Sequence, residues 1–221
     1  MSPRVIFEQE LKMLRDQVTE MGERAEISYD KLLLAINACD MEKLELLLDN
    51  DRQMTNMQRN IEAMCLTLLT KQQPVAKDLR LVTSALKVVT DIERIGDHVS
   101  DIAELYLRMG AETEQSPYGE HISAMMEEAK GMLSDAVDAF VNGNEEQAQD
   151  VVGRDDIVDD MFNGIKDAMM EAIRNRTLDA DKVVDILMIA KYLEKIGDHA
   201  VNIAEWAVFQ VTGDMQGVQL Y

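Results

Sequence analysis

The chain of 221 residues is 47% hydrophobic and 29% charged, enough to bury the core of one large domain or of two domains of about 100 residues. Its 42 acidic and 22 basic residues give a formal net charge of −20, and the basic residues are not segregated into a patch. We therefore expect no binding to a nucleic acid backbone, whereas metal cations and basic protein surfaces suit this charge. The acidic surface also has a simpler explanation, which is solubility.

Cysteine usage and hydropathy indicate a cytoplasmic protein. Cys39 and Cys65 form neither a CxxC pair nor a disulfide framework, so we expect both in the core. No stretch approaches the ~18 consecutive apolar residues of a membrane span, and the first residues do not resemble an export signal. We therefore expect no insertion into a membrane.

Helices are predicted throughout the first half. Prolines number only 3 and aromatic residues only 5%, while good helix formers abound. Apolar residues at helical spacing predict a first helix over 7–38, and Asp40 is a suitable N-cap for a second helix that runs to about residue 71. Pro74 interrupts the pattern, and a third helix is expected from about residue 78 to Gly110.

The pattern restarts after Pro117. Helices are predicted over 118–141, 145–175 and 179–211, with Asp179 as the N-cap of the last helix. Neighbouring helices joined by short turns run antiparallel. The expected fold is therefore all-α, with six long helices in two tandem antiparallel three-helix bundles, one formed by residues 1–112 and the other by residues 113–221.

An internal repeat supports this division. The segment DIERIGDHVSDIAEL at 91–105 returns as YLEKIGDHAVNIAEW at 192–206, with eight of fifteen positions identical and matching residues 101 apart. At about 100° per residue, the polar side chains of each copy form one narrow stripe along the predicted helix. The first stripe consists of Glu93, Asp97, Asp101 and Glu104, and the second of Glu194, Asp198, Asn202 and Glu205.

These stripes offer the hard oxygen ligands that metal cations prefer. In the first copy the stripe lies opposite Ile95, Val99 and Ile102, so it could also be the solvated side of an amphipathic helix. Like charges four residues apart cost a few tenths of a kcal/mol, however, and the arrangement occurs twice. We therefore expect two outward-facing stripes that can bind metal.

The middle helix of the second half supplies further carboxylates. Asp155 and Asp159 are four residues apart, and when Ile61 is aligned with Ile165, Asp51 matches Asp155 while Thr55 matches Asp159. The first site has fewer acidic ligands from this helix. We expect it to be smaller or weaker than the second.

Each copy also contains a glycine and a histidine beside the stripe. Because glycine inside a helix costs up to ~1 kcal/mol relative to alanine, Gly96 and Gly197 indicate a packing or site requirement. His98 and His199 lie about 100° from the neighbouring aspartates, so we expect hydrogen-bonded histidines at the edge of the core. Metal ligation by these histidines is the alternative.

The motifs ERIGDH and EKIGDH, each followed by IAE, together with QPVAKDLR at 73–80, closely resemble PhoU proteins over essentially the whole chain. The resemblance implies two tandem three-helix bundles that carry multinuclear clusters of divalent or trivalent metal ions, of iron or zinc type. Positions that match the family's ligands are Glu93, Asp97, Asp101, Glu194, Asp198, Asn202, Asp155 and Asp159. Asp51 joins this set through its match with Asp155.

The resemblance further implies a negative regulator of phosphate uptake and of the phosphate-starvation response. Such a protein links the ATPase side of a phosphate ABC transporter to a sensor histidine kinase, and would lie at the inner face of the membrane through these partners. Met-rich faces also suit a homodimer. A metal-independent acidic adaptor, and a partner of another phosphate transporter, remain as alternatives.

Enzymatic function has little support in the sequence. Di-iron bundle proteins carry Glu-x-x-His pairs, whereas the residues three positions after Glu93 and Glu194 are Gly96 and Gly197. A phosphate-binding Gly-x4-Gly-Lys loop is absent from the sequence, and no nucleophile with a matching base can be assembled. We therefore expect a regulatory protein without catalytic activity.

Overall fold

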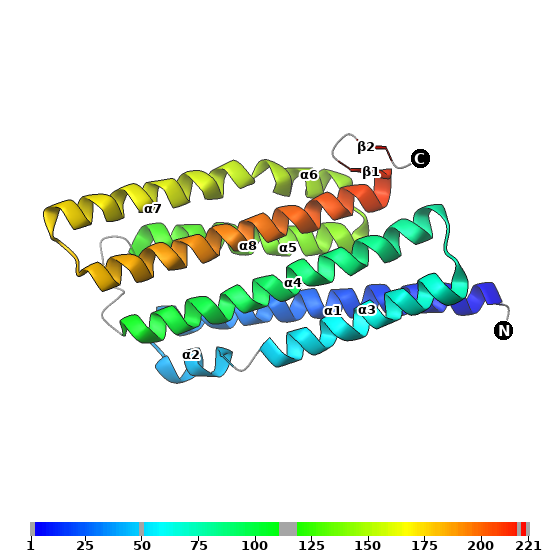
Figure 1. Cartoon of the computed structure of the whole chain (residues 1–221), viewed down its shortest axis with the longest axis horizontal. Coiled ribbons are helices and arrows are strands. Elements are labelled where there is room, and N and C mark those ends of the chain that lie inside the picture. Colours follow the sequence, from blue (N-terminus) through cyan, green and yellow to red (C-terminus); the bar gives the residue numbers. More distant parts are fainter. Residues whose placement is uncertain (1–2, 49–50, 111–118, 216–217, 220–221) are drawn as a thin grey trace.

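The computed structural model describes residues 3–48, 51–110, 119–215 and 218–219, and these residues are almost entirely helical (Figure 1). Side chains of residues 3, 51, 215, 218 and 219 lie outside this description. The helices are α1 (Pro3–Asn37), α2 (Met41–Leu47), α3 (Asp51–Gln72), α4 (Ala76–Met109), α5 (Gly119–Asn142), α6 (Glu145–Gly153), α7 (Asp155–Asn175) and α8 (Ala180–Thr212). A hairpin of two-residue strands, β1 (Asp214–Met215) and β2 (Val218–Gln219), follows α8.

The predicted all-α fold of two tandem three-helix bundles is confirmed, with one correction. The middle helix of each bundle was expected to be continuous, but it is divided into a short and a long helix, α2 with α3 and α6 with α7. Both predicted N-caps are confirmed, because the Asp40 carboxylate accepts from Lys43 N and the Asp179 carboxylate accepts from Asp181 N.

Arg154 explains the break between α6 and α7. Its backbone N–H donates to Val151 O, three residues earlier in the chain, as is usual in the last turn of a helix. Its guanidinium pairs with Glu128 and Asp135 of α5 at 2.6 and 2.7 Å. Gly131 makes room for this guanidinium, since a Cβ there would lie 2.7 Å from Arg154 Nη2. These two ion pairs with α5 therefore fix Arg154 at the helix break, where the periodicity of the sequence predicts one continuous helix.

The helices form two layers. In Figure 1, α3, α4, α8 and α7 lie side by side in front, with α1 and α5 behind them. We call the exposed side of the four-helix layer the front face. Since α4 and α8 run antiparallel, the start of α4 contacts the end of α8, where Arg80 Nε donates to Gln210 O at 3.2 Å. At the other end, Arg108 of α4 pairs with Asp185 of α8.

One continuous apolar core joins the two halves of the chain. Tyr29 of α1 is fully buried, and its hydroxyl donates to Met126 O of α5 at 2.8 Å. Of the two cysteines, Cys65 is buried as expected, but Cys39 lies just after α1 and is only partly buried. Among the described helices, none is long and apolar enough to cross a membrane.

Candidate metal-binding site

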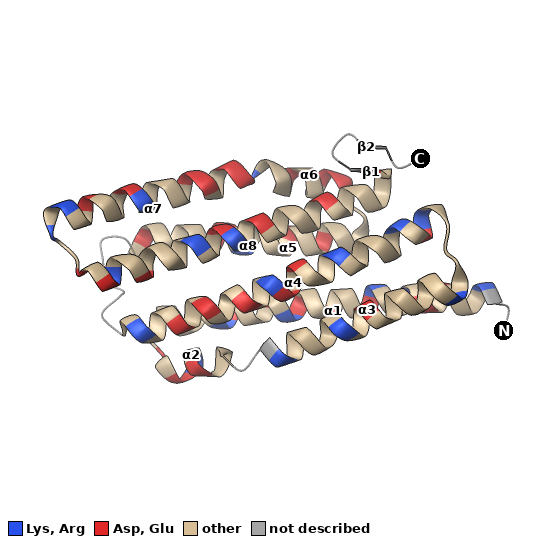
Figure 2. Cartoon of the chain, viewed as in Figure 1, with Lys and Arg blue, Asp and Glu red and all other residues tan. Residues whose placement is uncertain are grey.

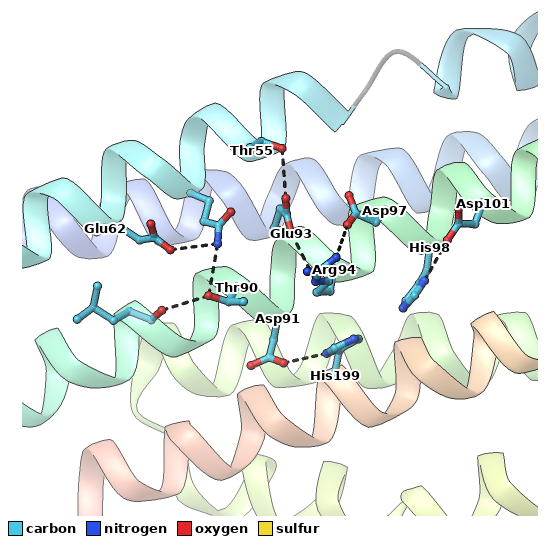
Figure 3. Close-up of polar contacts among 12 residues, drawn as sticks. Thr55, Glu62, Thr90, Asp91, Glu93, Arg94, Asp97, His98, Asp101 and His199 are labelled. Carbon is cyan, nitrogen blue, oxygen red and sulfur yellow. Dashed lines mark hydrogen bonds and ion pairs between the residues drawn. The ribbon is translucent and has the colours of Figure 1, made fainter.

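The first glutamate of each stripe, Glu93 or Glu194, lies in a groove between helices, which corrects the expected outward-facing arrangement at these two positions, whereas Glu104 is exposed as expected. Only 13% of the Glu93 side chain and 12% of the Glu194 side chain are exposed. Thr55 Oγ1 of α3 donates to Glu93 Oε1 at 3.2 Å (Figure 3). The side opposite each helix's apolar face is thus partly covered by the neighbouring middle helix.

In the first bundle, three of the stripe carboxylates have polar partners. Besides the bond from Thr55 to Glu93, Arg94 Nη1 donates to Asp97 Oδ2 at 3.2 Å, and Arg94 Nε lies 4.0 Å from Glu93 Oε2. Further along α4, His98 Nδ1 lies 3.3 Å from Asp101 Oδ2 (Figure 3). Arg94 and His98 thus compensate these carboxylates, while the side chain of Asp51, another predicted ligand, lies outside the described residues.

In the second bundle, carboxylates from two helices share one region. Glu194 and Asp198 of α8 and Asp159 of α7 are near enough to Asp155 that their charges act on it. Burial, and then these like charges, raise the pKa of the Asp155 carboxyl. The α6–α7 break contributes to this arrangement, because it places Asp155 in the first turn of α7, where a helix favours negative charge.

Two lysines partly neutralise this carboxylate group. Lys191 Nζ donates to Glu194 Oε1 at 2.6 Å, and Lys195 bonds Asp198 and lies 3.3 Å from Glu194 Oε2. Burial lowers the pKa of Lys195, but the hydrogen bond and charge of Asp198 outweigh it, so the pKa is raised. Each lysine is held in place by a carboxylate that a cation could also bind.

Asn202 lies away from this group. Its Nδ2 donates to Asp91 Oδ1 of α4 at 3.2 Å, so the structure does not bring this predicted ligand together with Glu194 and Asp198. The packing of α4 against α8 places the Asp91 carboxylate within hydrogen-bond distance of the Asn202 amide, which therefore points toward α4.

The residues of the second bundle fit a hard cation better than those of the first. Asp155 has mainly like charges around it, and the buried Glu194 Oε2 accepts no well-aligned hydrogen bond although Lys191 lies 2.6 Å away. Within the described ranges, however, no three His, Cys, Asp or Glu side chains are placed to hold a metal ion together. Binding would require Glu194 and Asp198 to exchange lysine for metal.

The expected hydrogen bonds of His98 and His199 are confirmed, but the polar cluster that these residues form between the bundles was not predicted from the sequence. His199 Nδ1 lies 2.8 Å from Asp91 Oδ1 (Figure 3), the His98 ring stacks on Tyr192, and the two histidine rings stack at 5.6 Å. Burial and the neighbouring His199 lower the pKa of His98 against the opposing effect of Asp101. The repeat held a signal for this cluster, because Asp91 matches Tyr192 and His98 matches His199, each 101 residues apart.

The two repeated glycines differ in how closely the middle helix approaches them. A Cβ on Gly197 would lie 3.3 Å from Val158 Cγ1 of α7, which is a tight contact, so Gly197 has the packing role that the sequence indicates. A Cβ on Gly96 would lie 3.4 Å from Met54 Cγ of α3, an ordinary van der Waals contact, so this position has room for a methyl group.

The chain is similar to known proteins over nearly its whole length. The family model described as PhoU domain matches residues 18–106 and 122–207, one segment in each half of the chain. The chain belongs to the PhoU family. It is 34% identical over 211 residues to a phosphate-specific transport system accessory protein PhoU homolog of Clostridium acetobutylicum, covering 95% of this chain and 96% of that relative.

PhoU proteins from other organisms are similar in sequence and structure. The chain is 30% identical to PhoU homolog 1 of Methanothermobacter thermautotrophicus, over 95% of this chain and 96% of that one. The crystal structure of the regulatory protein PhoU from Streptococcus pneumoniae has a TM-score of 0.87 at 26% identity, covering 96% of this chain and 100% of that chain. PhoU from Pseudomonas aeruginosa has a TM-score of 0.84 at 31% identity, covering 94% and 100%.

Proposed function

We propose that this protein is an accessory regulator of phosphate transport that binds metal ions. Its relatives are named as accessory proteins of the phosphate-specific transport system, and the similarity extends over nearly the whole chain. In this proposal the protein is cytoplasmic and connects the ATPase side of a phosphate ABC transporter to a sensor histidine kinase. It restrains uptake and the starvation response, lies at the membrane only through its partners, and forms a homodimer.

The observation that carries the metal proposal is the carboxylate group between α7 and α8. Glu194, Asp198, Asp155 and Asp159 would hold divalent or trivalent ions of iron or zinc type, since hard oxygen donors suit such ions. Burial, and then the charges of the neighbouring carboxylates, raise the pKa of Asp155, and a bound cation would offset both effects. Glu93, Asp97 and Asp101 form the weaker site, because Thr55 provides a hydroxyl where the second bundle has Asp159. The proposal includes multinuclear binding.

Elemental analysis of protein purified without a metal-affinity tag tests this proposal. We expect at least one equivalent of transition metal, and Glu194→Ala with Asp198→Ala should release metal from the second bundle with helicity by circular dichroism unchanged. A matched control, Glu127→Ala with Asp138→Ala, removes two exposed carboxylates of α5 and should retain the metal. Less than one equivalent in the wild-type protein, unchanged by reconstitution, would exclude metal binding.

The regulatory role is tested in cells that lack the gene. Loss should raise phosphate uptake and the expression of a phosphate-starvation reporter under phosphate-rich conditions, and the wild-type gene should restore repression. If the metal-free variant represses fully, the chain acts as a metal-independent acidic adaptor. If deletion leaves uptake and reporter unchanged, capture with the ATPase subunits of other phosphate transporters would identify the alternative partner.

A further inference from the structure

Two lysines of α8 occupy the carboxylates to which the proposed function assigns a metal ion. Lys191 Nζ lies 2.6 Å from both carboxylate oxygens of Glu194. Lys195 bonds Asp198 and lies 3.3 Å from Glu194 Oε2. A cation held between the two oxygens of one carboxylate takes the place of a bidentate metal ion. The Lys191 ammonium therefore lies where a metal ion would bind Glu194.

These ion pairs are more than contacts on an open surface. The side chains of Lys191 and Lys195 are 41% and 39% exposed, but that of Glu194 is only 12% exposed. In Figure 2, which looks onto the front face, basic positions of α8 stand among acidic positions of α7 and α8. Charge-assisted hydrogen bonds in such a partly buried groove are weakened less by water than exposed pairs. A metal ion that enters the groove has to break them, which lowers its affinity.

The first bundle has no counterpart of Lys191. Thr90 occupies the matching position, 101 residues earlier in the chain. At the spacing of 104 that relates the middle helices, Asp159 is matched by Thr55. At these two positions the second site thus has one more carboxylate and one more ammonium than the first. The additional ammonium compensates the charge of the additional carboxylate as long as no metal ion is bound.

An aromatic ring of α7 offers the Lys191 ammonium a second contact. Lys191 Nζ lies 5.2 Å from the centre of the Phe162 ring, and Lys166 Nζ lies 5.9 Å from the same centre. The face of an aromatic ring attracts an ammonium group. In the first bundle the positions that match Phe162 and Lys191 are Gln58 and Thr90, and Gln58 Nε2 donates to Thr90 Oγ1 at 3.4 Å (Figure 3). Lysine and ring therefore occur together in the second bundle and are replaced together in the first.

We propose that Lys191 and Lys195 are tethered counter-ions that compete with the metal ion for the carboxylates of the second bundle. Without metal they compensate the charge of Glu194 and Asp198. When a metal ion binds, Lys191 gives up Glu194 and keeps its contact with the Phe162 ring. The lysines thus weaken the site, so that its occupancy follows the concentration of free metal. The inference rests on the proposed metal binding and names the residues that regulate its affinity.

Binding of Zn²⁺ to the full chain, measured by competition with a chromophoric chelator after treatment with EDTA, tests this proposal. The binding event that Glu194→Ala with Asp198→Ala abolishes belongs to the second bundle. In Lys191→Gln the metal ion no longer has to break a charge-assisted bond, so the affinity of this event should rise by roughly 10–100-fold. Lys195→Gln, a second variant at a partly exposed position, should also raise it. Lys191→Arg keeps the charge and should restore the wild-type affinity.

Lys166→Gln is the matched control. Lys166 contacts the same ring as Lys191, but its Nζ donates to Asn163 Oδ1 at 2.6 Å instead of to Glu194, so its removal should leave the affinity for Zn²⁺ close to that of the wild type. Thermal unfolding gives an independent readout. Metal-free Lys191→Gln should melt about 3–10 °C below the wild type, because Glu194 loses its partner, and saturating Zn²⁺ should remove this difference. A side chain with a merely structural role would lower the affinity when replaced, not raise it.

The outcomes separate this inference from the proposed metal binding. If the wild type binds Zn²⁺ and Lys191→Gln binds it no more tightly, the lysines do not compete and metal binding stands. If Lys166→Gln raises the affinity as much as Lys191→Gln does, or if metal-free Lys191→Gln melts like the wild type, the inference is also wrong. Binding by Lys191→Gln but not by the wild type would support the competition and contradict metal binding by the natural protein. Binding by neither protein would overturn both.

Discussion

Gly22 is the point at which α1 and α5 cross most closely, and its replacement tests how the two bundles are joined. A Cβ at this position would lie 2.4 Å from Val137 Cγ1, 3.2 Å from Cγ2 and 3.4 Å from Cβ. The clash is with the Cγ1 methyl, and because β-branched residues in helices are largely held in one rotamer, Val137 cannot easily turn this methyl away. Gly22→Ala should therefore push the two helices apart.

Two opposing effects set the magnitude. Alanine in place of glycine stabilises a helix interior by about 1 kcal/mol, while overpacking a filled core costs about 1–3 kcal/mol. With the contact as short as 2.4 Å, the upper part of that cost applies, and Gly22→Ala should destabilise folding by about 1–2 kcal/mol. For a chain of this length the melting temperature should fall by roughly 2–8 °C.

A double-mutant cycle in urea, followed by circular dichroism, measures the effect. Val137→Ala removes the clashing methyls and with them the whole overpacking cost, so the Gly22→Ala/Val137→Ala protein should be about 2–3 kcal/mol more stable than the sum of the single changes predicts. Gly96→Ala is the matched control, because its neighbour is the flexible Met54 at 3.4 Å, and it should stabilise by about 0.5–1 kcal/mol. Equal stabilisation by Gly22→Ala and Gly96→Ala, without coupling to Val137, would refute the close crossing.

Two further predictions concern buried groups. Tyr29→Phe removes the hydroxyl that bonds to Met126 O and should cost about 1 kcal/mol in urea denaturation; a change below the error of the measurement would show that the bond contributes nothing. Burial raises the pKa of the Cys65 thiol to about 12, so at pH 8 the native protein should react with a thiol reagent only at Cys39, and rapid labelling of a Cys39→Ser variant would contradict this.

The sequence was sufficient for the fold class because repetition and periodicity are properties of the chain itself. The match between 91–105 and 192–206 placed Gly96 and Gly197 at equivalent points, and the structure shows each against its middle helix. N-caps such as Asp40 and Asp179 were also predictable, since their hydrogen bonds involve residues only two or three positions away.

Other features depended on neighbours that helical periodicity does not specify. The angle of Glu93 around its own helix says nothing about Thr55 on α3, so the stripe seemed solvated although its glutamate lies in a groove. Asn202 bonds to Asp91 of another bundle for the same reason. The α6–α7 break also comes from outside the helix, through the ion pairs that Arg154 makes with α5.

The amino-acid sequence by itself determined the two helical bundles, their relation as copies and the resemblance to PhoU proteins, because each of these follows from residue order and spacing. Only the tertiary structure decided which carboxylates gather, as Asp155 does with Glu194 and Asp198. It also decided that His98 meets Tyr192 and His199, because α4 packs antiparallel against α8 and so brings the two copies of the repeat side by side.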